Sequence, residues 1–213
     1  MIKAILFDFD GVVVQSEPLH LRSFRELFGP MGINLSPERW YSQFTGIGSP
    51  AIIRILFNDF NIREDVPTWV EKRKKHYQKL VLDDKLKPMK GIRRFLHYLK
   101  KKGIKTAIVS GGHSENIQLV LKKLKLEGLF DSIVSVESVQ NRKPHPEGFL
   151  LAAKRLGVKP SECIAIEDSP SGINAAHAAK MTVMCVQSPA PVDKNKCNYT
   201  IKDFIRFPKD LIK

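Results

Sequence analysis

The stretch that decides the fold reads Ile5-Leu6-Phe7-Asp8-Phe9-Asp10-Gly11-Val12-Val13-Val14. Its apolar start predicts a short strand buried on both faces, as in the centre of a parallel sheet. Side chains alternate along a strand, so Asp8 and Asp10 are expected on the same side. Two like charges about 4 Å apart repel by about 4 kcal/mol at an effective dielectric near 20. The pair therefore needs a cation or a shared proton, unless the two aspartates are simply solvated at a strand end.

The pattern on either side of residue 88 differs. Between residues 15 and 86 only helical signals occur, with helices expected to begin near Pro18, Ser36, Ser49 and Pro67. After residue 88 helices alternate with apolar strands, expected at residues 106–110, 132–136, 162–166 and 181–186. Such alternation predicts right-handed β-α-β units and a parallel sheet. We therefore expect an α/β fold whose sheet domain is split, with residues 16–87 inserted after the first strand.

Composition indicates an ordinary soluble globular protein. The 213 residues are 43% hydrophobic and 27% charged, and no apolar run is long enough to span a membrane. The N-terminus enters the first strand at once, so no signal peptide is expected. We expect the three cysteines, Cys163, Cys185 and Cys197, to be reduced thiols in a cytoplasmic protein.

The net charge of +13 raises nucleic acid as a partner. The lysines, however, recur on predicted amphipathic helices and at loop ends, which is typical of a solvated basic surface. We therefore expect no nucleic-acid partner and no membrane partner, and a chain that acts as a monomer. A basic surface also attracts anionic substrates.

Polar residues follow the ends of several predicted strands, and ligands of open parallel sheets bind at that edge. They are Asp8, Asp10, Ser110, Lys143, Glu167 and Asp168. Four carboxylates together require a hard cation, and oxygen ligands suit Mg²⁺. Lys143 and the backbone amides after Ser110 suit a phosphate. A carboxylate that faces a phosphoryl group can attack it and form an acyl phosphate.

At these residues the sequence resembles the haloacid dehalogenase-like hydrolase superfamily. The motifs that carry the resemblance are Asp8-Phe9-Asp10-Gly11-Val12-Val13, Ser110-Gly111, Lys143-Pro144 and Ile166-Glu167-Asp168-Ser169-x-x-Gly172. The segment Ser16-Glu17-Pro18-Leu19-His20 is similar to the β-phosphoglucomutase-like and phosphatase branch, which has a helical cap of the C1 type. The resemblance implies a Rossmann-like core (residues 1–15 and 88–213) and a mobile α-helical cap (residues 16–87).

The resemblance also implies roles for the core residues. Asp8 would be the nucleophile, and Asp10 would protonate the leaving oxygen and then activate water. Ser110 and the backbone of Gly111 and Gly112 would hold phosphoryl oxygens, and Lys143 would offset charge. Mg²⁺ would be bound by Asp8, the Asp10 carbonyl group, Asp168 and, directly or through water, Glu167. For Glu167 and Asp168 the alternative is an acidic pair favoured by a helix N-terminus, and for Lys143 a surface lysine before a turn.

In the cap, the resemblance implies that His20, Gly46 and Ser49 contact substrate, although His20 could also be a helix-face histidine without a role. Two departures from the family pattern stand out. Lys180 replaces a glycine usual before the last strand. Ser49-Pro50 falls where β-phosphoglucomutases have Gly-x-Ser-Arg, whose arginine holds a second phosphate. Arg54 and the run Lys72-Arg73-Lys74-Lys75 are the nearest replacements.

We therefore predict a Mg²⁺-dependent phosphatase that acts on a small phosphorylated metabolite, such as a sugar phosphate, through an aspartyl phosphate. The first alternative is a phosphosugar isomerase of the β-phosphoglucomutase type. The second, from another class, is a non-catalytic basic binding module.

Overall fold

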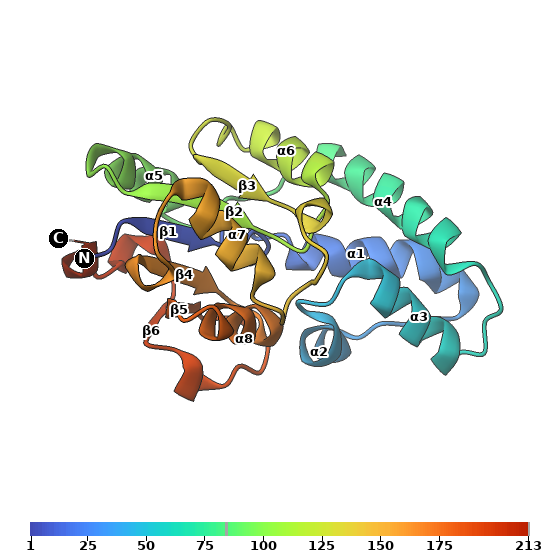
Figure 1. Cartoon of the computed structure of the whole chain (residues 1–213). Coiled ribbons are helices and arrows are strands. Elements are labelled where there is room, and N and C mark those ends of the chain that lie inside the picture. Colours follow the sequence, from blue (N-terminus) through green and yellow to red (C-terminus); the bar gives the residue numbers. More distant parts are fainter. Residues whose placement is uncertain (84, 213) are drawn as a thin grey trace.

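The computed structural model describes residues 1–83 and 85–212 and is built on one parallel sheet (Figure 1). Its six strands lie in the order β3-β2-β1-β4-β5-β6 and all pair in parallel. They are β1 (Ala4–Phe7), β2 (Lys105–Val109), β3 (Ser132–Val134), β4 (Cys163–Glu167), β5 (Thr182–Val186) and β6 (Tyr199–Ile201). The predicted Rossmann-like α/β class with an inserted helical segment is confirmed.

Helices connect the strands and fill the insertion. After β1 come α1 (Glu17–Phe28), α2 (Pro37–Arg39), α3 (Ser49–Asp59) and α4 (Val66–Asp83). The core helices are α5 (Ile92–Lys101), α6 (Ser114–Lys123), α7 (Glu147–Leu156) and α8 (Pro170–Ala178). Prolines at the first or second positions of α1, α2, α3 and α8 set the φ angle for these helix starts. No helix among the described residues is both long and apolar enough to cross a membrane.

Alternate side chains of β1 reach two apolar clusters. Ile5 and Phe7 pack with residues of α5 and α6 on one face, and Ala4 and Leu6 pack with α7 and α8 on the other (Figure 1). The four residues of β1 are fully buried, as a central parallel strand requires. This packing fixes the carboxyl end of β1 in the middle of the sheet.

The helical insertion has a third cluster of its own. It includes Phe24 and Phe28 of α1, Trp40, and Ile53 and Leu56 of α3. Helix α4 belongs to both parts: Trp69 and Val70 pack against this third cluster, whereas Tyr77, Leu80 and Val81 belong to the cluster beneath the sheet. The division at residues 15 and 87 stays a prediction, and we use "cap" for residues 16–87 below.

Two features differ from expectation. Strand β6 was not predicted, because three residues, two of them exposed, carry no hydrophobic period. The expectation of three reduced thiols is wrong: Cys185 of β5 and Cys197, just before β6, form a disulfide with a Cα–Cα distance of 5.7 Å. Pairing of β5 with β6 brings these two cysteines together, while Cys163 remains a buried free thiol.

Candidate active site

Three strand ends bring the predicted core residues together. Asp8 follows β1, and its backbone N–H donates to the Ile166 carbonyl oxygen of β4 (2.9 Å). Ser110 follows β2, and Glu167 is the last residue of β4. Neighbouring parallel strands end at the same edge of the sheet, so Asp8, Ser110 and Glu167 lie close together at that edge.

Lys143, between β3 and α7, reaches the acids from the side. Its Nζ donates to Asp8 Oδ1 (2.6 Å), to the Val109 carbonyl oxygen (2.8 Å) and to the Glu167 carboxylate. Burial alone lowers the pKa of Lys143, but Asp8 and Glu167 outweigh burial and raise it above its ordinary value. Lys143 is therefore an ammonium at neutral pH, placed to offset charge on a group bound at Asp8.

Glu147 at the start of α7 holds the loop that carries Lys143. The backbone N–H groups of residues 140 and 141 donate to its two carboxylate oxygens (2.8 and 2.9 Å). Charge-assisted bonds of this kind fix the loop and lower the pKa of Glu147.

Asp8, Glu167 and Asp168 form the acidic cluster of the site. Each offers a carboxylate oxygen within 4.8 Å of the others, and all three are buried. Burial and Glu167 raise the pKa of Asp8 to about 8, although Lys143 opposes them. Burial and Asp8 likewise raise the pKa of Asp168 well above its ordinary value. One ammonium thus fails to balance three acids, and the all-oxygen donor set fits Mg²⁺, which would supply the missing positive charge.

Gly11 makes the approach of Asp168 to the first strand possible. A Cβ atom at Gly11 would lie 2.0 Å from Asp168 Oδ2, and the residue has a φ of +77°. Glu167 is enclosed in a similar way, since a Cβ at Gly172 would lie 1.9 Å from its Oε1. Ser169 Oγ donates to Glu167 Oε2 (3.1 Å), which holds this acid in place. These close approaches explain the glycines in both motifs.

The Asp10 side chain is bonded to the cap. Its Oδ1 accepts hydrogen bonds from Ser16 Oγ and from His20 Nε2, the latter at 2.9 Å. Burial acts to raise the pKa of Asp10, but His20, Ser16 and Arg73 outweigh it, so the pKa lies below its ordinary value. The Asp10 side chain is thus held as a carboxylate at the base of α1.

Arg73 of α4 is a site residue that the sequence reasoning named only as part of a basic run that could replace the mutase arginine. Its Nη2 donates to His20 Nδ1, so the other ring nitrogen of His20 carries the proton it donates to Asp10. The guanidinium also lies over the rings of Phe24 (5.0 Å) and Tyr77 (4.8 Å). Arg73 is buried, and its Nε has no hydrogen-bond partner among the described residues. Arg73 precedes Tyr77 by one helical turn and so lies on the same face of α4. This spacing is the sequence signal that could have placed Arg73 at the site.

The loop before α3 places the cap against the core. Ser171 Oγ donates to the Gly46 carbonyl oxygen (2.9 Å). A Cβ at Gly46 would lie 2.7 Å from the Cβ of Ser169, and one at Gly48 would lie 2.8 Å from Arg142 Nη1. The cap loop therefore contacts the core at two places, the start of α8 and Arg142.

The segment after β2, residues 110–113, also lines the site. Gly112 N–H donates to Ser110 Oγ (3.0 Å), and His113 Nδ1 pairs with Glu137 Oε1 (2.6 Å). Burial acts to raise the pKa of Glu137, but hydrogen bonds from Ser135, His113 and backbone N–H groups lower it to about 2. His113 is thus held beside a permanent carboxylate.

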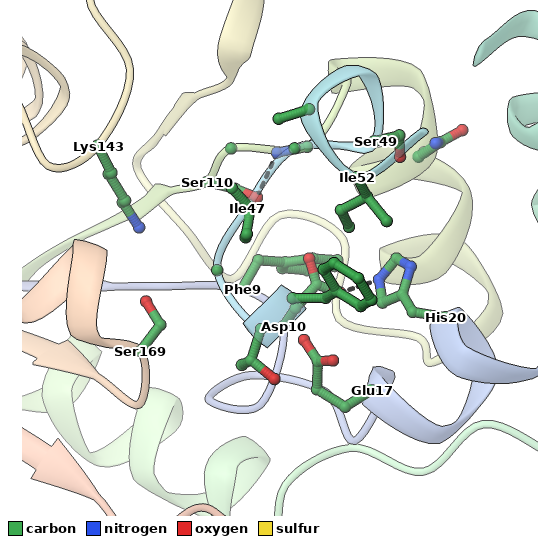
Figure 2. Close-up of a pocket in the computed structure, with 18 of the residues that line it drawn as sticks. Phe9, Asp10, Glu17, His20, Ile47, Ser49, Ile52, Ser110, Lys143 and Ser169 are labelled. Atoms are coloured by element: carbon green, nitrogen blue, oxygen red, sulfur yellow. Dashed lines mark hydrogen bonds and ion pairs between the residues drawn. The ribbon is translucent and has the colours of Figure 1, made fainter. Parts of the chain in front are cut away.

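Cap and core enclose a pocket of about 270 Å³ (Figure 2). Every predicted site residue except Glu167 lines the pocket. The predicted residues of the core thus lie together with His20, Gly46 and Ser49 of the cap. Arg73, from the basic run named as a replacement for the mutase arginine, also lines the pocket. Lining residues that the sequence reasoning gave no role include Glu17, Trp40, His113 and Arg142. Arg54, a predicted replacement for the mutase arginine, is exposed and is not among them.

Comparisons with known proteins agree with this architecture. Residues 5–186 match the family model described as haloacid dehalogenase-like hydrolase, so the chain belongs to that family. It is similar to a phosphorylated carbohydrates phosphatase of Thermotoga maritima, with 32% identity over 84% of this chain and 82% of that protein. It is also 34% identical, over 88% of its length, to the protein SUPPRESSOR OF QUENCHING 1 of Arabidopsis thaliana, of which it spans only 18%.

Among solved structures, a β-phosphoglucomutase of Clostridium difficile superposes with a TM-score of 0.83 at 28% identity. The match covers 100% of this chain and 96% of that one. The predicted superfamily, its branch of phosphatases and β-phosphoglucomutases, and the prediction of an enzyme are thereby confirmed.

Proposed function

We propose that the protein is a Mg²⁺-dependent phosphatase of a small phosphorylated metabolite, with sugar phosphates as the favoured class. The observation that carries the proposal is the contact of Asp8 with Lys143, among acids that lack sufficient positive charge, in a pocket between cap and core. The relative named a phosphorylated carbohydrates phosphatase supports the substrate class. The residue roles below, the bound Mg²⁺ and the residue limits of the cap belong to the same proposal.

In this mechanism Asp8 attacks the phosphorus atom and the bond to the leaving oxygen breaks, which leaves an aspartyl phosphate. Lys143, Ser110 Oγ and the backbone N–H groups after Ser110 bind the phosphoryl oxygens. Mg²⁺, held by Asp8, the Asp10 carbonyl group, Asp168 and, directly or through water, Glu167, would neutralise the charge on the transferred group.

Asp10 is the proposed acid and base. In the structure it accepts from Ser16 and His20 and its pKa is lowered, so this arrangement suits the second step, in which a carboxylate takes a proton from the attacking water. For the first step Asp10 must hold a proton, which requires it to leave this pair of donors. Substrate bound in the pocket would favour that change by excluding water.

The second candidate is a β-phosphoglucomutase-type isomerase, favoured by the C. difficile structure and by two arginines that line the pocket. A mutase must hold a second phosphate firmly, and a guanidinium suits that task. Arg73, however, is bound to His20, and Arg142 is exposed at Gly48. Phosphatase activity is therefore the better-supported proposal.

The test is phosphate release from a panel of sugar phosphates with and without Mg²⁺, using wild-type protein and Asp8→Asn. We expect Mg²⁺-dependent release that Asp8→Asn abolishes without loss of fold by circular dichroism. Conversion of β-glucose 1-phosphate to glucose 6-phosphate, with a bisphosphate primer, exceeding phosphate release would show the mutase instead. No release or conversion in any condition would favour a non-catalytic module.

A further inference from the structure

The disulfide between Cys185 and Cys197 lies next to the acidic cluster. In the pairing of β4 with β5, Cys185 is in register with Glu167. Cys185 packs with Ala165 and Val183 in the apolar cluster on the α7 and α8 side of the sheet. Glu167 is two residues after Ala165, so alternation along β4 places Glu167 on the same face. The disulfide is therefore one strand spacing, about 5 Å, from a residue of the acidic cluster.

The segment that carries Cys197 also contacts the helix that holds Glu167. Cys197 directly follows a short 3₁₀ turn that ends at Lys196. Lys196 Nζ donates to Asn174 Oδ1 of α8 (2.7 Å). The N-cap residue of the same helix is Ser169, whose Oγ donates to Glu167 Oε2 (3.1 Å). A change in the position of the Cys197 segment therefore reaches Glu167 through α8.

The two cysteines differ in their freedom to move. Cys185 is 2% exposed, and β5 is paired with a strand on each side. Cys197 is half-buried and follows a turn in which residues 194 and 195 are exposed. When the bond between them breaks, the two sulfur atoms become non-bonded neighbours and must move apart to van der Waals contact. Because Cys185 is fixed in the sheet, this displacement falls on Cys197 and its turn.

We propose that the disulfide between Cys185 and Cys197 is a redox-sensitive element that fixes the start of α8 and, with it, Glu167 and Asp168. A dithiol reductant attacks the Cys197 sulfur through one thiolate, and its second thiolate then releases Cys197 from the mixed disulfide. The protein gains two electrons and two protons as two thiols, and the dithiol becomes a cyclic disulfide.

The consequence of reduction is a less rigid acidic cluster, which binds a divalent cation less tightly. Groups that orient a metal ligand affect metal affinity even when they do not touch the metal. The inference rests on the proposed Mg²⁺-dependent function and adds a regulation of the same site. A disulfide that acts only by restricting the unfolded chain would change thermal stability and leave the native site unchanged. The test must therefore measure the native state.

The experiment compares oxidised wild-type protein with wild-type protein reduced by dithiothreitol and with Cys197→Ser. Without metal, amide hydrogen exchange in α8 should be at least about tenfold faster in the reduced protein and in the variant than in the oxidised protein. Exchange in α7, which covers the same face of the sheet, should stay unchanged and serves as the internal reference. Calorimetric titration with MgCl₂ should give a Kd about tenfold higher for the reduced protein.

The matched control is Cys163→Ala, because Cys163 is a buried free thiol on β4 in the same apolar cluster. This variant should respond to dithiothreitol as the wild type does, whereas Cys197→Ser should not respond. If Cys197→Ser does not fold, the reduced wild-type protein decides.

Equal exchange in α8 of oxidised and reduced protein overturns the proposal. Reduced protein that unfolds as a whole also overturns it, since the bond would then hold the fold rather than the site. Faster exchange with unchanged Mg²⁺ affinity overturns the regulation of the site. Absence of Mg²⁺ binding and of phosphate release in both redox states overturns the proposed function instead, so the two failures are distinguishable.

Discussion

Replacing Gly46 by alanine should displace the cap loop from the core without changing any acid, base or metal-binding group. The added Cβ would lie 2.7 Å from the Cβ of Ser169 and 2.8 Å from Ser171 Oγ, whereas ordinary contact begins at 3.4 Å. Ser171 can rotate its hydroxyl group away. Ser169 cannot yield as easily, because it is buried and its Oγ is bonded to Glu167. The loop must therefore retreat by roughly 0.7 Å, and misplacement near 1 Å can cost about 100-fold in rate.

We expect Gly46→Ala to lower kcat/KM for phosphate release by about 10- to 100-fold. The matched control is Gly32→Ala in the same cap: its φ of +82° resembles the +79° of Gly46, but a Cβ there meets no atom within 4 Å. Both variants strain a left-handed residue by roughly 1 kcal/mol, so Gly32→Ala should lose about that much stability and Gly46→Ala at least as much. Steady-state kinetics and thermal unfolding measure the two effects. Equal kcat/KM in both variants would refute the reasoning that contact at Gly46 closes the site.

Three further outcomes are expected. Without a cation, burial raises the pKa of Asp8 from 3.8 to about 8, so the folded protein keeps a proton that the unfolded chain loses. The free energy of unfolding should then fall as pH rises from about 4 to about 8. Mg²⁺ should raise the melting temperature more at about pH 8 than at about pH 5, and equal increases in melting temperature at the two pH values would contradict this. Lys180→Gly should raise the free energy of unfolding by about 0.5–1 kcal/mol in urea titration, because Lys180 has a φ of 58°, which favours glycine. A loss of stability would show that contacts of the lysine side chain outweigh this backbone strain. Thiol titration of unreduced, denatured protein should find only Cys163, and three reactive thiols would exclude the disulfide between Cys185 and Cys197.

The core half of the site could be predicted because each of its residues is marked by the short stretch of sequence next to it. Asp8, Ser110 and Glu167 each follow an apolar run that can only be a buried strand, and parallel strands end at one edge. No long-range contact had to be known for this step. The strand ends and the confirmed family assignment therefore agree with the sequence reasoning, whereas the roles of the individual residues still await the experiments above.

The cap half depended on how helices pack, which sequence spacing only suggests. Arg73 lies in a basic run that is typical of a solvated face, and only its phase with Tyr77 indicated an inward position. Glu17 is one residue from Ser16 in sequence, yet its place in the pocket depends on Trp40, 23 residues away. The disulfide was missed for the same reason, because its formation depends on the short strand β6.

Helix α4 couples the unfolding of the cap to that of the core. Its first half packs against the cap cluster through Trp69 and Val70, and its second half is buried beneath the sheet through Tyr77, Leu80 and Val81. Loss of the cap structure would therefore expose one end of a helix whose other end is anchored elsewhere. We expect the two parts to melt as one cooperative unit, with amide hydrogen exchange in the middle of α4 as slow as in the strands.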